Sequence, residues 1–321
     1  MTAERTRPGL IDRLPAVQGG LVPDAPVARF TWFKVGGPAE VLFEPLDADD
    51  LQRFLAAKPV DVPVTVVGAA SNVIVRDGGI PGVVVRLGRG FARIAVDGVD
   101  IEAGAAAHDI TVARRARDAG ISGLEFLAGI PGSIGGAVRM NAGAYGSEIK
   151  DVIVAADVVD PKGGRHRLTA AELGLSYRGC GVADDWIFVA ARLRGRPGDK
   201  DRIQSRIQEI QSQRESTQPV RTPTGGSTFR NPPGRNAWEL IEQAGCRGLR
   251  RGGAQVSNMH CNFLINTGGA TAADLEGLGE EVRRRVFETS GVSLEWEIRR
   301  LGVVAEPAAR EFANRGGKEN A

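Results

Sequence analysis

The segment GIPGSIGGAVRMNAGAYGSE, at residues 129–148, constrains the fold of this chain more than any other. It holds six glycines and almost no charge. Each glycine gives up more backbone freedom on folding than any other residue, so a chain tolerates this density where the backbone must approach something closely or adopt a positive φ. Successive N–H groups in such a loop form a concave nest that holds phosphate oxygens. The segment therefore indicates a nucleotide or dinucleotide diphosphate, with a run of tight turns in a glycine-rich enzyme as the alternative.

The composition excludes several classes of protein. A hydrophobic content of 42% over 321 residues suffices for two globular domains with a substantial core. The net charge of +2, from 41 basic and 39 acidic residues, argues against a nucleic acid as the main partner. No apolar run approaches the length that crosses a bilayer, so no membrane partner is expected. The three cysteines lack CxxC spacing and the three histidines lack metal-ligand spacing, so we expect no disulfide framework, no metal and a reducing, cytoplasmic location.

Runs of β-branched residues alternate with turn signals and short helical patterns, which predicts an α+β fold with mixed sheets. Strands are predicted at residues 40–45, 64–69, 83–87, 94–97, 152–159, 186–193, 262–266 and 292–301, and helices at 47–58, 109–119, 202–218, 236–244 and 272–290. The segment GRPGDK at residues 195–200 reads as a linker. We therefore predict a flexible arm at 1–23, a first domain at 24–198, a second domain at 199–304 and a flexible tail at 305–321.

Two more glycine turns precede the predicted linker. VVGAASNVIVRDGG, at residues 66–79, places a glycine and the polar pair Ser71 and Asn72 between two predicted strands, and TWFKVGGPA spans residues 31–39. Glycine lets backbone approach a ligand and the polar pair supplies donors, although Ser-Asn after a strand is often only a turn. The glycine loop lacks the GxGxxG spacing of a Rossmann site, and the chain has no GK[ST] sequence. The three turns together favour one extended ligand on open loops.

In this order the three turns resemble the FAD-binding segments of the UDP-N-acetylenolpyruvoylglucosamine reductase family. Four further segments agree with that family: LSYRGC at 175–180, GSTFRNP at 226–232, HCNFLIN at 260–266 and LEWEIRRLG at 294–302. The resemblance implies an FAD-binding domain of the vanillyl-alcohol-oxidase type over 24–198, built from two mixed α/β subdomains, and a smaller substrate-binding α+β domain over 199–304. It also implies noncovalent FAD, NADPH as co-substrate and a UDP-sugar substrate. The implied reaction reduces an enolpyruvyl ether to a lactyl ether in peptidoglycan precursor synthesis.

The resemblance assigns three catalytic residues. Ser227 matches the family's proton donor, although alone it reads as a turn serine. Arg178 matches the catalytic arginine, and a guanidinium can stabilise the negative charge that builds beside the substrate carboxylate once hydride from flavin N5 reaches the enolpyruvyl methylene. Glu297 matches the catalytic glutamate. Because a carboxylate beside developing negative charge is repulsive unless it is protonated or paired, we predict a raised pKa for Glu297.

The same resemblance assigns the binding residues. For FAD these are Thr31, Gly36, Gly37, Gly68, Ser71, Asn72, Gly129, Pro131, Gly132, Ser133, Gly135, Gly136, Asn141, Gly143 and Ala144. For the substrate they are Tyr177, Arg230, Asn231, His260 and Asn266, where His260 could equally be a core histidine.

The sequence also departs from part of the family. One subtype covers the UDP moiety with a tyrosine-bearing loop, but no tyrosine follows Tyr177, so this chain resembles the shorter subtype. A monomer or weak oligomer is expected. Two other functions stay open: an FAD oxidoreductase of the same fold that acts on a hydroxy acid or sugar lactone, and a nucleotide-sugar binding protein without catalysis. GSTFRNP and LEWEIRR favour the reductase over the first, and the three catalytic residues favour it over the second.

Overall fold

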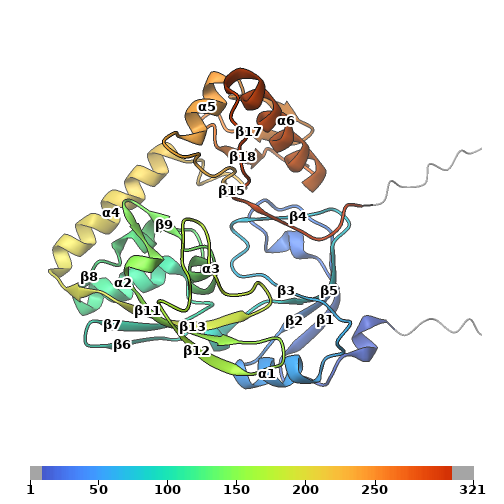
Figure 1. The fold of residues 1–321 in the computed structure, drawn as a ribbon, viewed down its shortest axis with the longest axis vertical. Helices are drawn as coiled ribbons and strands as arrows, with labels where there is room; N and C mark the ends of the chain where they lie inside the picture. The colour runs from blue at the N-terminus through green and yellow to red at the C-terminus, as the bar shows by residue number, and fades with distance from the viewer. Residues whose placement is uncertain (1–8, 306–321) are drawn as a thin grey trace, which may run out of the picture.

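The computed structural model describes residues 9–305, which form two sheet units below and a smaller unit above them (Figure 1). The first unit is a four-stranded sheet in the order β1-β2-β5-β3. Strand β1 runs antiparallel to β2, whereas β2 and β3 run parallel to β5. Its elements are β1 (Gly20–Ala25), β2 (Ala39–Glu44), α1 (Ala48–Ala57), β3 (Val64–Val66) and β5 (Ile80–Val85).

The second unit is a five-stranded antiparallel sheet in the order β12-β11-β13-β7-β6. Its strands are β6 (Ile94–Asp97), β7 (Asp100–Gly104), β11 (Ile153–Val159), β12 (Arg165–Thr169) and β13 (Ile187–Arg194). The segments that pack with this sheet in one hydrophobic core are α2 (Asp109–Ala119), η4 (Glu125–Gly129) and α3 (Ile134–Arg139). The glycine loop thus enters α3 directly, beside the start of α2.

The third unit joins a four-stranded sheet, in the order β15-β18-β17-β16, to two helices. Its elements are β15 (Thr224–Ser227), α5 (Ala237–Gln243), β16 (Arg250–Arg251), β17 (Ala254–Val256), β18 (Phe263–Asn266) and α6 (Ala272–Ser290). Helix α6 begins with a capping box, because Thr271 Oγ1 accepts from the backbone N–H of Asp274 and the Asp274 carboxylate accepts from the backbone N–H of Thr271. Gly291 ends the helix at φ 69°.

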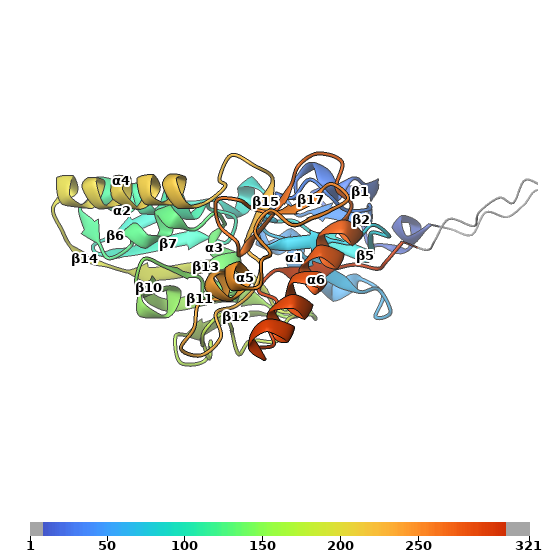
Figure 2. The ribbon, with the colours of Figure 1, turned by 90° about the horizontal axis from the view of Figure 1, so that it is seen from above.

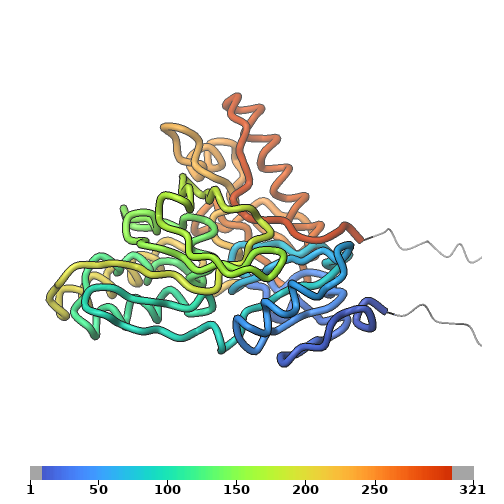
Figure 3. The backbone as a smooth tube through the Cα atoms, turned by 60° about the horizontal axis from the view of Figure 1, so that its bottom comes forward, coloured from blue at the N-terminus to red at the C-terminus, as the bar shows by residue number. Residues whose placement is uncertain are grey.

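Short elements connect these units. The strand pairs are β8 (Ile121–Ser122) with β14 (Arg196–Pro197), β9 (Gly143–Ala144) with β10 (Ser147–Glu148), and β4 (Val73–Val75) with β19 (Arg299–Leu301). The remaining 3₁₀ turns are η1 (Leu10–Arg13), η2 (Val27–Arg29), η3 (Arg89–Phe91) and η5 (Ile149–Asp151). The β4–β19 pair is parallel and brings the end of the third unit back onto the first (Figure 3).

The long helix α4 (Lys200–Thr217) changes the predicted domain boundary. Its buried residues Ile203, Ile207 and Ile210 belong to the same hydrophobic core as the second sheet unit. The helix lies along α2 and the edge of that unit, as the view from above shows (Figure 2). Helix α4 therefore packs as part of the N-terminal domain, and the third unit begins after residue 217. The glycines and charged residues at 195–200 form the turn that leads into the helix.

The predicted arm at residues 1–23 also differs from the structure. Strand β1 pairs with β2 along its length, and Leu10, Ile11, Leu14 and Val17 pack against the first core. This segment does not read as a strand in the sequence, because it is an edge strand that contains a proline and a charged residue and whose side chains are mostly exposed. Residues 1–8 and the predicted tail beyond 305 lie outside the described residues.

The predicted strand at 292–301 is reduced to its last three residues, β19. The preceding residues cross between two units and share only one bridge, between Phe229 and Trp296. The α+β class itself is confirmed, with two mixed subdomains and a smaller C-terminal unit. Over residues 9–305 no helix is long and apolar enough to cross a membrane, and the same residues hold no metal-ligating cluster of His, Cys, Asp and Glu.

The packing of α4 gives a first prediction. Ile207→Ala should lower the free energy of unfolding by about 2–5 kcal/mol, the usual cost of emptying a buried isoleucine site. Gln208→Ala, on the exposed face of the same helix, is the matched control and should change it by less than about 0.5 kcal/mol. Urea denaturation measures both. Equal effects would contradict the assignment of α4 to this core.

Candidate active site

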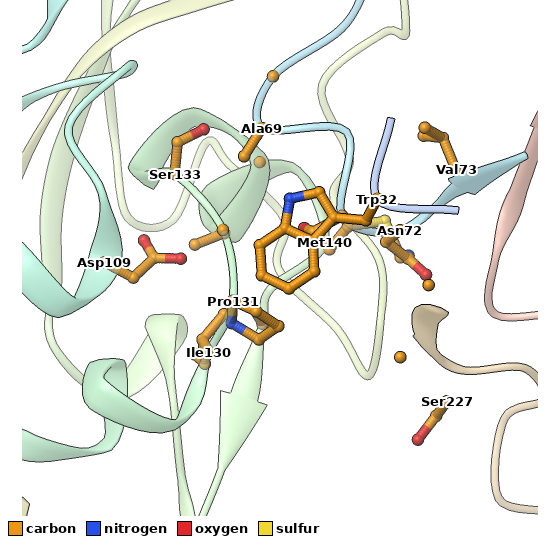
Figure 4. Close-up of a pocket in the computed structure, with 18 of the residues that line it drawn as sticks. Trp32, Ala69, Asn72, Val73, Asp109, Ile130, Pro131, Ser133, Met140 and Ser227 are labelled. Carbon is orange, nitrogen blue, oxygen red and sulfur yellow. The ribbon is translucent and has the colours of Figure 1, made fainter. Parts of the chain in front are cut away.

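A cavity opens where the three units meet, and backbone from two glycine turns forms much of its wall. Val66–Val73 lines one side of the cavity, Gly129–Ser133 with Gly136 lines a second side, and Thr224–Ser227 of the third unit lines a third side. Figure 4 shows Ser227 across the cavity from Asp109 and the loop at Ile130 and Pro131, with the indole of Trp32 between them. The predicted residues on this wall are Gly68, Ser71, Asn72, Gly129, Pro131, Gly132, Ser133, Gly136, Gly143, Ala144, Arg178, Ser227 and Glu297.

The two glycine turns face each other at close range. A Cβ atom on Gly68 would lie 3.1 Å from Ser133 Oγ, so glycine at 68 keeps the turns close without a side chain between them. Ile134 N donates to Ala107 O at 3.0 Å, which anchors the second turn to the segment that leads into α2. The turns thus form one continuous backbone wall.

Arg178 and Glu297 form an ion pair at the edge of this wall. Arg178 Nε donates to Glu297 Oε1 at 2.7 Å, and Arg178 Nη2 donates to Gly143 O at 3.3 Å. Both side chains are largely buried, at 19% and 14% exposure. Arg178 lies in a tight turn at φ 53°, a left-handed conformation that costs a non-glycine residue free energy and clusters at functional sites.

Backbone bonds bring Glu297 to the cofactor wall and to Ser227. Glu297 N donates to Thr228 O at 2.8 Å, directly after Ser227. Asn72 Nδ2 donates to Glu297 O at 3.2 Å, and Arg299 N donates to Asn72 O at 3.1 Å. The segment that carries Glu297 is therefore held between the first glycine turn and β15.

Burial raises the pKa of Glu297 above its usual value, and Arg178 offsets part of this effect. The direction is the one expected, but its cause is burial of the carboxyl group and not a neighbouring negative charge. Because the folded protein holds this proton more tightly than the unfolded chain, the contribution of Glu297 to the free energy of unfolding falls as pH rises from the ordinary glutamate range through the raised pKa.

Several residues predicted to contact FAD lie away from this cavity. Thr31 is fully buried and its hydroxyl donates to Val35 O at 3.0 Å. Asn141 is buried as well, and its amide donates to Glu148 and to Ser176 O. Gly36 and Gly37 pack against backbone of the 75–79 segment, and Gly135 against Ala105 and a neighbouring cavity. These residues shape the turns that form the wall.

The predicted substrate residues are also dispersed. Arg230 lines an adjoining cavity with Arg178 and Glu297. Asn231 Oδ1 accepts from Ala237 N at 2.9 Å at the start of α5, and Asn266 Nδ2 donates to Phe33 O at 2.9 Å. His260 is largely buried, and burial lowers its pKa. Tyr177 is exposed beside the Arg178 guanidinium.

Other residues of the cavity wall were not predicted: Trp32, Asp109, Met140, Arg214, Gln218 and Arg299. Trp32 and Arg299 lie inside segments that the sequence analysis singled out, and their side chains could have been considered there. Arg214 and Gln218 lie at the end of α4, which reads as an ordinary polar helix. Asp109 stands at the first position of α2, where an acidic residue is ordinary, so its sequence position gives no sign of a place in the cavity wall.

The cavity fits an extended dinucleotide. It shares Gly68, Ala69, Ser133 and Gly136 with a second cavity that runs along the first sheet unit, so the two form one elongated site. The shared wall offers backbone N–H groups for phosphates, while Trp32, Met140 and Val220 line the first cavity with apolar surface for a flat ring. The Arg178–Glu297 pair and Ser227 lie beside that apolar part. This arrangement is that of a dinucleotide-binding protein in which polar side chains of the second and third units meet the cofactor wall.

Comparison with known proteins specifies the class and the family. Residues 39–169 match a family model described as an FAD binding domain, so the chain is an FAD-binding oxidoreductase. Residues 218–301 match the C-terminal domain of UDP-N-acetylenolpyruvoylglucosamine reductase. A curated UDP-N-acetylenolpyruvoylglucosamine reductase of Parvibaculum lavamentivorans is 62% identical over 95% of this chain and 98% of its own, and one of Rhodospirillum rubrum is 58% identical over 94% and 97%. The chain belongs to the UDP-N-acetylenolpyruvoylglucosamine reductase family.

A solved structure agrees. The crystal structure of UDP-N-acetylenolpyruvylglucosamine reductase from Thermus caldophilus superposes with a TM-score of 0.76 at 35% identity, over 89% of this chain and all of that one. The match to the C-terminal domain begins at residue 218, directly after α4 ends. This start agrees with the packing of α4 against the N-terminal part.

The ion pair gives a second prediction. Arg178→Met should raise the pKa of Glu297 further, because burial continues to disfavour the carboxylate while the nearest cation is lost. Arg230→Met is the matched control and should raise it less, since Arg230 acts only at longer range. Infrared titration of the Glu297 carboxyl in protein without cofactor measures both. A pKa that stays constant or falls in Arg178→Met would contradict the described pairing.

Proposed function

We propose that this chain reduces UDP-N-acetylglucosamine enolpyruvate to UDP-N-acetylmuramate with NADPH, as a cytoplasmic step of peptidoglycan precursor synthesis. The observation that carries the proposal is the meeting of Ser227 and the Arg178–Glu297 pair at the apolar end of the FAD cavity. Bound FAD supplies a hydride carrier that accepts from NADPH and delivers to the enolpyruvyl methylene. NADPH and substrate occupy the same cleft in turn, and the enzyme acts as a monomer or weak oligomer.

Ser227 supplies the proton that completes the reduction. After hydride reaches the methylene, negative charge lies on the adjacent carbon, which is a strong base, so a weak acid in the right place suffices. Ser227 ends β15, where its backbone pairs with Phe263 of β18. The strand pairing fixes the backbone from which the hydroxyl extends, which supports the positioning that general-acid catalysis requires.

Arg178 binds the substrate carboxylate and stabilises the charge that spreads into it. Glu297 and Gly143 O occupy Nε and Nη2, which fixes the guanidinium plane. The remaining N–H groups are directed by that plane and can donate charge-assisted hydrogen bonds to a carboxylate oxygen. A preorganised cation of this kind stabilises the transition state without reorganisation.

Glu297 orients Arg178 and limits repulsion. Its raised pKa favours the neutral acid, which a nearby anion tolerates better than a carboxylate. When it is ionised, its charge is paired with Arg178 at 2.7 Å. In both states Asn72 and Thr228 hold the backbone from which this side chain extends.

An adjoining cavity suits the anionic end of the substrate. Arg178 and Glu297 connect it to the FAD cavity, and six arginines line it against two acidic residues. The arginines are Arg76, Arg139, Arg178, Arg230, Arg299 and Arg300. A nucleoside diphosphate group is a natural occupant of such a surface, because guanidinium groups bind phosphate oxygens in a bidentate way.

Ser227→Ala should separate the two half-reactions. NADPH should still bleach the flavin absorbance at the wild-type rate, whereas reoxidation by the enolpyruvyl substrate should slow by about 10²- to 10⁴-fold, the range for a positioned general acid. Anaerobic stopped-flow absorbance measures both steps.

Ser205→Ala is the control, because Ser205 is exposed on α4 and its hydroxyl donates only to Asp201 O. Both half-reactions should keep their rates in that variant. Normal reoxidation of Ser227→Ala would remove Ser227 from the mechanism, and a wild-type flavoprotein that the enolpyruvyl compound fails to reoxidise would refute the proposed function.

A further inference from the structure

One buried acidic group in the cavity wall has no role in the mechanism above. Asp109, the first residue of α2, is 0% exposed, and both of its carboxyl oxygens lack a hydrogen-bond partner among residues 9–305. An unpaired polar group at such a site costs free energy, so buried groups normally have partners. The residue nevertheless lines the FAD cavity.

The carboxyl group points at the glycine loop. A Cβ atom on Gly132 would lie 2.8 Å from Asp109 Oδ2 and 3.8 Å from Ser71 Oγ. The side-chain oxygens of Asp109 and Ser71 therefore lie near the same point on the surface of the loop. Asp109 N donates to Gly132 O at 3.2 Å, which fixes the start of α2 against this loop. Figure 4 shows the Asp109 side chain directed toward the loop at Ile130 and Pro131, on the side away from Ser227.

The surroundings disfavour the charged form of this group. Burial raises the pKa of Asp109 well above its usual value, and among residues 9–305 no basic side chain offsets this effect. His108, its neighbour in sequence, is exposed and directs Nδ1 to Gly132 O at 3.4 Å instead. A neutral carboxylic acid has an O–H donor and a carbonyl acceptor, and here neither is used by the protein.

We propose that Asp109 is a cofactor-binding residue, whose neutral carboxylic acid donates a hydrogen bond to an oxygen of the bound FAD at the Gly132 side of the cavity. Two parts of FAD carry such oxygens, the diphosphate and the ribityl chain. The proposal rests on the FAD-binding function and requires no particular substrate. Binding of FAD would give the group the partner it lacks, so the free protein carries a cost that the cofactor removes.

Two variants test this, with FAD affinity and the stability of the apoprotein as readouts. Asp109→Leu keeps the approximate shape but removes the donor, and it should weaken FAD binding by about 10- to 100-fold, as expected for a lost bond to a polar or charged partner. The same change should leave the unfolding temperature of the apoprotein equal or higher, because it removes an unpaired buried group. Asp109→Asn keeps a donor and an acceptor, and it should bind FAD within about threefold of wild type.

Quenching of FAD fluorescence measures the affinity, and thermal unfolding of the cofactor-free protein measures the stability. Asp118→Leu, at an exposed position near the end of the same helix, is the matched control and should change neither. ADP and riboflavin as separate ligands identify the oxygen, since weaker ADP binding in Asp109→Leu indicates the diphosphate and weaker riboflavin binding indicates the ribityl chain.

Three outcomes would overturn the proposal. The first is wild-type FAD affinity in Asp109→Leu. The second is a less stable or unfolded Asp109→Leu apoprotein, because that shows a partner within the protein. The third is an equal loss of affinity in Asp109→Asn, which excludes a neutral donor. Failure of the proposed reductase reaction is separate, since it would appear as normal FAD binding without turnover of the enolpyruvyl compound.

Discussion

The parallel pairing of β19 with β4 is the contact on which the site depends. It joins Arg299–Leu301 to Val73–Val75, two segments more than two hundred residues apart in the chain. Through it Asn72, in the first glycine turn, bonds to the backbone on both sides of Ile298 and so holds Glu297 at the cofactor cavity. The core of the third unit also includes Phe33, Val35 and Ile74 of the N-terminal part. This pairing, together with that shared core, brings Ser227, Arg178 and Glu297 to one cavity.

The sequence predicts those parts of the fold that local chemistry determines. Helix α6 has the predicted bounds, because a capping pair, an apolar stripe and a terminal glycine all agree. Helix α2 likewise has the predicted bounds. Leu294 and Ile298 of the predicted strand at 292–301 are buried, although this segment is not a strand. Its pairing was not predictable, because pairing depends on a partner far along the chain.

The predictions that differ from the structure concern residues whose surroundings come from distant parts of the chain. Nothing local distinguishes α4 as part of the N-terminal core, since its isoleucine stripe would suit any apolar surface. Asn266 and Asn231 stand in motifs that resemble those of the substrate side, yet their amides hold backbone, which is how such motifs keep their shape. Asp109 was overlooked because an acidic residue at a helix start is ordinary in sequence. Only the structure shows that the glycine loop covers its carboxyl group and that the carboxyl oxygens have no hydrogen-bond partner among the described residues.

The position of β19 has a consequence for synthesis of the protein. A polypeptide emerges from the ribosome with its N-terminus first, so both glycine turns leave the ribosome long before Glu297 and Arg299. The nascent chain can therefore build the two sheet units and α4, while one wall of the cavity is still missing. The side chains that complete the cavity are among the last to be synthesised, and the wall closes only once β19 has paired with β4.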